Sequence, residues 1–388
     1  MPETLVHGFV ADKFGSVRDA FEANFAGGSD IGASCCATWE GETVVDLWGG
    51  FADAAKTRSW EKNTIVNVFS TTKTMTALTA LLIAARGELD FDAPVARYWP
   101  EFAANGKERI KVSQLMSHSS GLSGWKEPLK AGDLYDWEKM TSLLAAQAPL
   151  WAPGTASGYH ANTFGFLVGE VVRRITGKSL GTVFREEIAE PLGADFHIGL
   201  PASEDSRVAE IVPWVLPEST GKIALSEVQE ITLRNMGFEV ADTSTRAWRA
   251  AEIPAVNGHG NARSVAEIHC ILANGGVAKG KRIMSEAGCR KVLEQQIEGR
   301  DLVMSHLPAA RFGMGFALPG PLLDVALPNP NTIHWGGGGC SWIFIDMDAH
   351  TTFAYVANKM DRRFFNDPRP FRTMQAMWQS LGICTGAA

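Results

Sequence analysis

The sequence predicts an α+β protein in which both ends of the chain build one antiparallel sheet and the middle of the chain is mainly helical. Two observations predict this fold. Segments rich in β-branched and aromatic residues lie near both termini, at 32–52 and 341–359, whereas apolar residues at helical spacing dominate the chain between them. The 388 residues suffice for one large domain or for two interleaved ones.

The N-terminal part predicts a helix followed by a β-hairpin. We expect the helix at 16–25, SVRDAFEANF. The segments GASCCATW at 32–39 and TVVDLWGGFA at 43–52 flank a Glu-Gly-Glu turn at 40–42. Two alternating, β-rich runs joined by so short a polar turn predict a pair of antiparallel strands.

The middle of the chain begins with a strongly apolar helix. From residue 70 to residue 86, helical spacing relates Met75, Leu78, Leu81, Leu82 and Ala85. Gly87 then suits the C-terminal cap of this helix. Further helices are predicted at 135–147, 163–175, 179–189, 226–235 and 264–273.

The C-terminal part returns to a strand pattern. SWIFIDMDAHTTFAYVANK, at 341–359, contains two β-rich runs around a polar turn at 346–350, and a last helix is expected at 370–381. We therefore predict a discontinuous sheet domain formed by 1–68 and 276–388, and a mainly helical domain formed by 69–275. The active site is expected between the two.

Composition excludes several classes of function. The net charge is −7 and no block of Lys or Arg occurs, so no nucleic-acid partner is expected. No His or Cys cluster has zinc spacing, so no metal site is expected. No apolar run approaches the length of a membrane span and the start of the chain resembles no signal peptide, so we expect no membrane association.

The cysteines indicate a reducing compartment, and hence a cytoplasmic protein. Most of the six cysteines lie in apolar segments, as buried free thiols do. Cys35 and Cys36 are adjacent in a predicted strand and would face opposite sides of it, so a disulfide between them is not expected.

A serine three residues before a lysine occurs four times, at Ser59, Ser70, Ser123 and Ser219. Only Ser70 opens an apolar helix, where residues i and i+3 share a face and Lys73 can reach the Ser70 hydroxyl. The start of a helix also offers unpaired N–H groups and the positive end of a dipole. Burial would lower the lysine pKa and make neutral Lys73 a base. On the helix alone, however, a simple N-cap serine with a solvated lysine is the favoured interpretation.

Two further segments could complete such a site. Tyr159 ends the loop WAPGTASGYHANTFG just before a predicted helix, and loops on rigid supports often carry catalytic groups. The run HWGGGGC at 334–340 places four glycines before a strand, where backbone N–H groups can approach a ligand closely. Taken singly, each segment also has an ordinary structural explanation.

Together, these three segments resemble the serine β-lactamase and penicillin-binding-protein superfamily, and most closely the family VIII carboxylesterases related to class C β-lactamases. The resemblance covers most of the chain and includes VSQLMSHSSGL at 112–122 and RFGMGF at 311–316. It implies a β-lactamase/transpeptidase-like fold. It also implies that Ser70 is the nucleophile, Lys73 its base and Tyr159 the proton relay to the leaving group. The N–H groups of Ser70 and Gly337 would form the oxyanion hole, and His118 would pin a loop behind the site.

The sequence departs from the family pattern at two motifs. The common Tyr-x-Asn is Tyr159-His160-Ala161 here, with Asn162 one position late. The common Lys-Thr-Gly is His334-Trp335-Gly336, which supplies little fixed positive charge. An anionic penicillin therefore loses its anchor unless Arg263 or Arg311 replaces it, whereas an uncharged ester loses nothing. We expect the substrate pocket to include Trp335, His334, Gly336, Trp125 and Trp151.

The sequence thus predicts a cofactor-independent serine hydrolase that cleaves small uncharged carboxylic esters through a Ser70 acyl-enzyme. The chain contains no G-x-S-x-G motif, which argues against an ordinary α/β-hydrolase. The alternatives are an amide or peptide hydrolase, a weak β-lactamase or an acyltransferase on the same site. A catalytically inactive ligand-binding homologue is less favoured, since all three candidate residues are intact. The protein is expected as a monomer or a homodimer.

Overall fold

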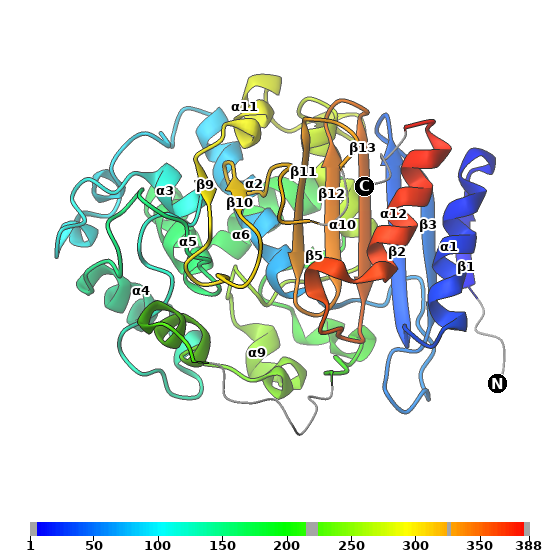
Figure 1. Ribbon diagram of the computed structural model, residues 1–388, viewed down its shortest axis with the longest axis horizontal. Helices are drawn as coiled ribbons and strands as arrows, with labels where there is room; N and C mark the ends of the chain where they lie inside the picture. The colour runs from blue at the N-terminus through cyan, green and yellow to red at the C-terminus, as the bar shows by residue number, and fades with distance from the viewer. Residues whose placement is uncertain (1–5, 215–223, 324–326, 384–388) are drawn as a thin grey trace.

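The sheet is built from both ends of the chain, as the sequence predicts. The structure is a computed structural model and describes residues 6–214, 224–323 and 327–383. Six antiparallel strands stand in the order β1-β3-β2-β13-β12-β11 (Figure 1). Their bounds are Val6–Val10 (β1), Gly32–Trp39 (β2), Glu42–Gly50 (β3), Thr332–Gly337 (β11), Ser341–Asp346 (β12) and Thr351–Ala357 (β13). The sequence pattern missed β1 and gave β11 only as a glycine-rich strand start.

Helices cover both faces of the sheet. On one face, α1 (Gly15–Ala26) and α12 (Pro368–Ser380) pack side by side, as Figure 1 shows. On the other face, α10 (Ala262–Ala273) packs against β2 and β13. Cys35 contributes to the first of these apolar layers and Cys36 to the second, and both are free thiols. The expected opposite orientation of the two cysteines is confirmed.

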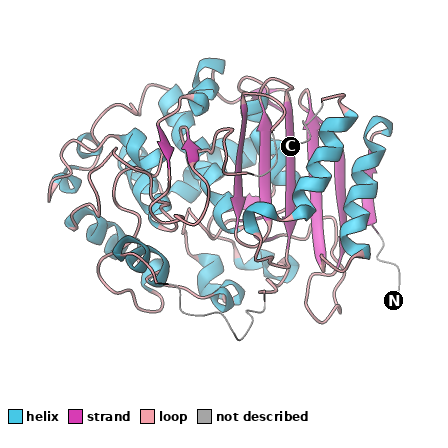
Figure 2. Ribbon diagram, viewed as in Figure 1, coloured by secondary structure: helices cyan, strands magenta, loops and turns pink. Residues whose placement is uncertain are grey.

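The rest of the chain forms a mainly helical region beside the sheet (Figure 2). Its helices are α2 (Thr72–Ala85), α3 (Val112–Met116), α4 (Trp137–Ala146), α5 (Thr163–Thr176), α6 (Leu180–Phe184), α7 (Glu190–Leu192), α8 (Glu227–Gln229), α9 (Arg246–Ala250) and α11 (Glu286–Arg290). Single π-helical turns at Arg185–Ala189 and Glu230–Arg234 extend α6 and α8. The short strands are β4 (Val66–Asn67), β5 (Phe196–His197), β6 (His259–Gly260), β7 (Val277–Ala278), β8 (Lys281–Arg282), β9 (Ile297–Gly299) and β10 (Ala310–Phe312).

Two elements cross the boundaries predicted for the domains. Helix α10 lies within the segment 69–275 but packs on the sheet, and α11 lies within 276–388 but contacts α2. The division into a sheet domain and a helical domain therefore stays a prediction, and these two helices tie the two parts together.

Helix α2 is the centre of the helical region. The sequence predicts one apolar face for it, yet every residue from Thr71 to Ile83 is buried. A helix buried on all sides needs partners for its polar side chains. Its threonines find them in backbone carbonyls: for example, the Thr72 hydroxyl donates to the Phe69 carbonyl, and that of Thr76 to the Pro254 carbonyl. The helix is thereby fixed from end to end.

No helix in the described part of the chain is long and apolar enough to cross a membrane.

A buried ionic cluster joins α12 to the sheet. Arg369 is 1% exposed and lies between the carboxylates of Asp30 and Asp367, at 2.7 and 2.6 Å. The Tyr355 hydroxyl from β13 donates to Asp30, and the Cys340 thiol at the β11–β12 turn donates to Asp367 at 3.1 Å. Removing one member of such a cluster leaves a charge buried without its partner, which is strongly destabilising.

We predict that Arg369→Ala lowers the free energy of unfolding by about 3–5 kcal/mol. The matched control is Arg363→Ala in the same C-terminal segment. Arg363 is half-exposed and pairs with Asp361, and such surface pairs contribute at most about 1 kcal/mol. Urea unfolding followed by tryptophan fluorescence measures both variants. Equal losses of unfolding free energy in the two variants would show that the buried cluster stabilises the protein no more than a surface ion pair does.

Candidate active site

Ser70 lies on a strained turn at the start of α2. The turn Phe69–Thr71 is 3₁₀ and leads directly into the helix. Phe69 has a φ of 44°, which is costly for a bulky residue and is tolerated only where packing enforces it. Its ring packs against Gly339, where a Cβ would lie 2.6 Å from the ring. The β11–β12 turn therefore holds the backbone in the conformation that presents Ser70.

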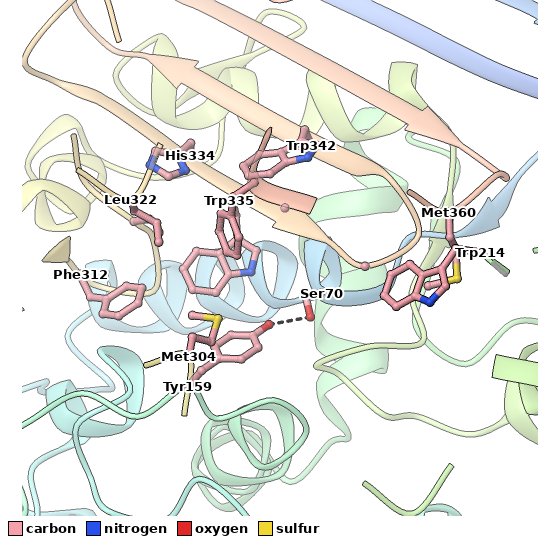
Figure 3. Close-up of a pocket in the computed structure, with 14 residues that line it drawn as sticks. Ser70, Tyr159, Trp214, Met304, Phe312, Leu322, His334, Trp335, Trp342 and Met360 are labelled. Atoms are coloured by element: carbon pink, nitrogen blue, oxygen red, sulfur yellow. Dashed lines mark hydrogen bonds between the residues drawn. The ribbon is translucent and has the colours of Figure 1, made fainter. Parts of the chain in front are cut away.

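Lys73 and Tyr159 both reach the Ser70 hydroxyl. Lys73 Nζ lies 3.1 Å from Ser70 Oγ, and the Tyr159 hydroxyl donates to the same oxygen at 2.6 Å (Figure 3). Lys73 Nζ also stands 4.9 Å from the centre of the Tyr159 ring. The three side chains thus form one continuous path along which a proton can move.

Lys73 is fully buried, and this burial disfavours its charged form. Desolvation lowers the pKa of the Lys73 amine well below its ordinary value. The amine donates to the carbonyl of Ala161 at 2.6 Å and to that of Ala255 at 2.9 Å. A neutral amine has two hydrogens, so both are engaged by these carbonyls and the lone pair is left for the Ser70 hydroxyl. This geometry suits a general base.

The Tyr159 loop is held from both sides. Asp301 Oδ1 accepts from the Tyr159 backbone N–H at 3.0 Å. His118 accepts twice: its carbonyl from the Gly158 N–H at 2.9 Å, and its Nδ1 from the His160 N–H at 3.2 Å. His118 therefore sits behind the site, where the sequence places it. Burial raises the pKa of the Tyr159 phenol, so this group keeps its proton and can donate it.

Gly337 at the end of β11 lies against the turn that carries Ser70. A Cβ at Gly337 would lie 2.2 Å from the Val68 carbonyl and 3.0 Å from the Ser70 nitrogen, so only glycine permits this approach. The neighbouring Ser341 hydroxyl donates to the Val68 carbonyl at 2.6 Å and lies 2.8 Å from the Thr71 hydroxyl. These contacts fix the backbone of 337 beside that of Ser70.

An apolar pocket opens in front of Ser70. Its volume is about 230 Å³, and no Lys, Arg, Asp or Glu is among the lining residues that the structure describes. Besides Ser70 and Tyr159, the walls consist of Trp214, Met304, Phe312, Ala317, Leu322, His334, Trp335, Gly336, Gly338, Trp342, Met360 and Phe365. The pocket therefore suits a small ligand without charge.

Comparison with known proteins identifies the family. The family model described as Beta-lactamase matches residues 18–376. The chain belongs to the β-lactamase family.

Members of the family that resemble this chain include esterases. The esterase/β-lactamase LipL of Mycobacterium tuberculosis is 35% identical over 377 residues, which is 92% of this chain and 83% of LipL. A crystal structure of a family VIII carboxylesterase has 43% identity and a TM-score of 0.91, and covers 97% of this chain and 100% of the other. A penicillin-binding protein homolog from Caulobacter crescentus has 37% identity and a TM-score of 0.89, with the same coverage. The predicted resemblance and fold class are confirmed.

The family's third motif splits between two faces of an edge strand. In β11, the His334 ring stacks near Trp342 and Phe344 on one face, whereas Trp335 stacks on His118 on the other. Burial lowers the pKa of His334 to about 3, so the ring is neutral at physiological pH. Neither member of the motif supplies a positive charge.

The two arginines considered as replacements are engaged elsewhere. Arg263 pairs with Asp46 at 3.0 Å, and Arg311 bonds to Gln295 and to the Pro319 carbonyl. Neither lines the pocket. Asn162, which stands one position after the usual place in the motif, donates from its side-chain amide to the Met236 carbonyl at 2.8 Å.

Two of the tryptophans predicted for the pocket lie elsewhere. Trp125 is 1% exposed in the core, where its indole N–H donates to the Met140 carbonyl at 3.0 Å. Trp151 supports the Tyr159 loop from behind and donates to the Ala156 carbonyl at 2.9 Å. Neither residue lines the pocket, so the expectation for both is wrong. Their closeness to the site in the sequence does not reveal which way the rings face.

The other serine–lysine pairs have no such geometry where they are described. Ser123 is buried and lies 2.6 Å from the Thr232 hydroxyl, while Lys126 is exposed. Ser59 and Lys62 are both exposed. The pair Ser219 and Lys222 lies outside the described residues.

The sequence missed Asp301 and most of the pocket walls. Asp301 is 142 residues from Tyr159, and its Oδ1 also accepts from the N–H groups of Val303 and Met304. No local pattern separates it from other acidic residues. The missed wall residues are Trp214, Met304, Phe312, Ala317, Leu322, Gly338, Trp342, Met360 and Phe365.

A fluorophosphonate probe should label Ser70, and Gly337→Ala should slow this labelling by about 10²-fold. The added methyl would push 337 away from the Val68 carbonyl and remove an N–H donor from the phosphonyl oxygen, and one such donor is worth about this factor. Rates of adduct formation are followed by intact-protein mass spectrometry, with peptide mapping of the adduct.

The matched control is Gly338→Ala, because a Cβ at 338 meets nothing within 4 Å. This variant should react at close to the parent rate. Equal slowing in both variants, or an adduct on Ser59 or Ser123, would contradict the geometry described.

Proposed function

We propose that the protein is a serine hydrolase that cleaves small uncharged carboxylic esters through an acyl-enzyme on Ser70. The observation that carries this proposal is the apolar pocket beside the hydrogen-bonded Ser70, Lys73 and Tyr159, whose described walls include no charged side chain. The similarity to a family VIII carboxylesterase and to LipL supports it.

In the acylation step, neutral Lys73 takes the hydroxyl proton of Ser70 as Oγ attacks the ester carbonyl carbon. The backbone N–H groups of Ser70 and Gly337 bind the oxyanion that forms, where donors fixed in advance contribute most. The carbon–alkoxy bond then breaks, and Tyr159 gives its proton to the leaving alcohol. The proton held by Lys73 replaces the one that Tyr159 lost.

Deacylation follows the same path in reverse. Water attacks the acyl carbonyl and gives a proton to the Tyr159 oxygen as Tyr159 passes its own proton to Lys73, and the same N–H groups bind the second oxyanion. The Ser70–acyl bond breaks, Ser70 regains its proton, and the carboxylic acid leaves. Dividing one difficult displacement into two easier ones is the gain from a covalent intermediate.

The pocket favours esters over penicillins. A penicillin carries a carboxylate, and removing a carboxylate from water without a cationic partner is costly. The described walls offer neutral His334 and aromatic rings, while an alkyl or aryl ester needs only apolar contact.

The name of LipL includes β-lactamase, so weak lactam hydrolysis is the second candidate for this chain. Amide hydrolysis and acyl transfer would use the same acyl-enzyme. An inactive binding protein is disfavoured because the Ser70, Lys73 and Tyr159 side chains are not only present but hydrogen-bonded through the Ser70 hydroxyl.

The five described cysteines are buried free thiols, which supports a cytoplasmic location.

A panel of p-nitrophenyl esters together with the β-lactam nitrocefin tests the proposal. We expect rapid hydrolysis of short-chain esters and no turnover by Ser70→Ala. The kcat/KM for nitrocefin should be lower than that for the esters by about 10²-fold or more, because its unpaired carboxylate is costly to bury. Rapid-quench mass spectrometry should find the acyl group on the Ser70 peptide. A nitrocefin kcat/KM equal to that of the best ester would refute the substrate class.

Lys73→Ala and Tyr159→Phe should each lower kcat by about 10²-fold or more, as expected for general acid–base groups. Lys126→Ala, which changes an exposed lysine, and Tyr98→Phe serve as controls and should keep near-normal kcat. Circular dichroism checks that all four variants are folded. Near-normal turnover in either test variant would remove that residue from the mechanism.

The kcat/KM of the parent protein should rise from acid toward neutral pH. Protonated Lys73 has no lone pair, so activity increases as the pH rises through its lowered pKa. Because burial raises the pKa of Tyr159, activity should then stay level into mildly alkaline solution. The pH–rate profile of a p-nitrophenyl ester measures this, and an optimum on the acid side would contradict a lysine base.

A further inference from the structure

One wall of the pocket carries the indole N–H of Trp335. Trp335 is 6% exposed, and no acceptor among the described residues lies within hydrogen-bond distance of its Nε1. Its ring is held in place by stacking on His118, at 5.4 Å and 18°, and by contact with Phe312. An indole N–H can only donate, and a buried donor without an acceptor is unfavourable.

This donor faces the site of reaction. Trp335 lines the pocket, and Figure 3 shows its nitrogen on the edge of the indole turned toward Ser70 and Tyr159. Two tryptophans outside the pocket differ in this respect. The indole N–H groups of Trp125 and Trp151 donate to backbone carbonyls, at 3.0 and 2.9 Å.

The position of Tyr159 indicates which part of an ester meets this donor. Under the proposed function, on which this inference rests, the N–H groups of Ser70 and Gly337 bind the carbonyl oxygen and Tyr159 protonates the leaving alcohol. The rings of Trp335 and Tyr159 are 6.1 Å apart. In Figure 3, Trp214 and Met360 lie on the opposite side of Ser70. The indole N–H therefore lies on the side of Ser70 where the alcohol portion of the ester binds. The acyl group binds on the opposite side, near Trp214 and Met360.

We propose that Trp335 Nε1–H binds a neutral oxygen in the alcohol portion of the substrate. The preferred substrates are then esters of alcohols that carry a second acceptor, such as an ether or a further ester group, rather than esters of plain alkyl alcohols. The acceptor must be neutral, because one indole N–H cannot offset the cost of burying a carboxylate in these walls. The remaining contacts of such an alcohol are with Phe312, Leu322 and Met304.

The test compares 2-methoxyethyl acetate with n-butyl acetate, which differ by one oxygen in place of one methylene. The ratio of their kcat/KM values is divided by the ratio of their alkaline hydrolysis rates, which removes the intrinsic difference in reactivity. We expect the corrected ratio to be about 3- to 10-fold in favour of the methoxyethyl ester, the effect of one ordinary hydrogen bond. It should fall to about one in Trp335→Phe.

Two further variants make the result specific to the N–H. Trp335→3-benzothienylalanine keeps the bicyclic shape and should also abolish the preference, and it replaces the phenylalanine variant if that protein does not fold. Met304→Leu, which alters the pocket wall without removing a donor, should change both rates and leave the ratio in place.

The inference is overturned if the parent protein shows a corrected ratio near one, or if the ratio persists in both Trp335 variants. Failure of the proposed function looks different. In that case the parent protein hydrolyses neither acetate nor any p-nitrophenyl ester.

Discussion

Lys73 is buried without a counter-ion among its described hydrogen-bond partners, and three oxygens from three separate parts of the chain surround its amine. These are the hydroxyl of Ser70, the carbonyl of Ala161 and the carbonyl of Ala255. A charged amine is costly in such a place, and burial therefore lowers the pKa of Lys73. Helix α2, the Tyr159 loop and the turn before β6 bring the three oxygens together around the amine. In the proposed mechanism, the same constraint turns an ordinary lysine into a base.

The sheet supplies the rest of the site through its edge strand. Gly337 can approach Ser70 because it lacks a Cβ, and the Ser341 hydroxyl ties the same turn to the Val68 carbonyl. The alternation of side chains along β11 then places His334 and Trp335 on opposite faces. Both occupy the motif that is commonly Lys-Thr-Gly, and neither supplies a positive charge, so this strand edge presents an aromatic wall. In the proposed function, substrate preference therefore follows from these two positions, while Ser70, Lys73 and Tyr159 are the reacting groups.

Sequence patterns predicted what depends on local order. The strands at both ends, the helix at Ser70 and the loop at Tyr159 each have a recognisable local period or composition. Contacts between distant segments were not predictable in this way. Asp301 supports Tyr159 across 142 residues, and no spacing marks it. Trp125 was misplaced because its orientation depends on a carbonyl of α4 that accepts its N–H. The complete burial of α2 was not predicted because threonines on a helix usually indicate an exposed face in the sequence. Here their hydroxyls donate to backbone carbonyls, which allows these polar residues to be buried.

The central claim is that burial keeps Lys73 neutral at physiological pH, and the pKa of Lys73 tests it most directly. Protein labelled with ¹³C at the lysine side chains gives one NMR titration curve per lysine, and Lys73→Met identifies the signal in question. The account predicts a pKa well below the ordinary value of about 10.4, because burial disfavours the charged amine. A Lys73 signal that titrates near 10.4, like those of the exposed lysines, would contradict it.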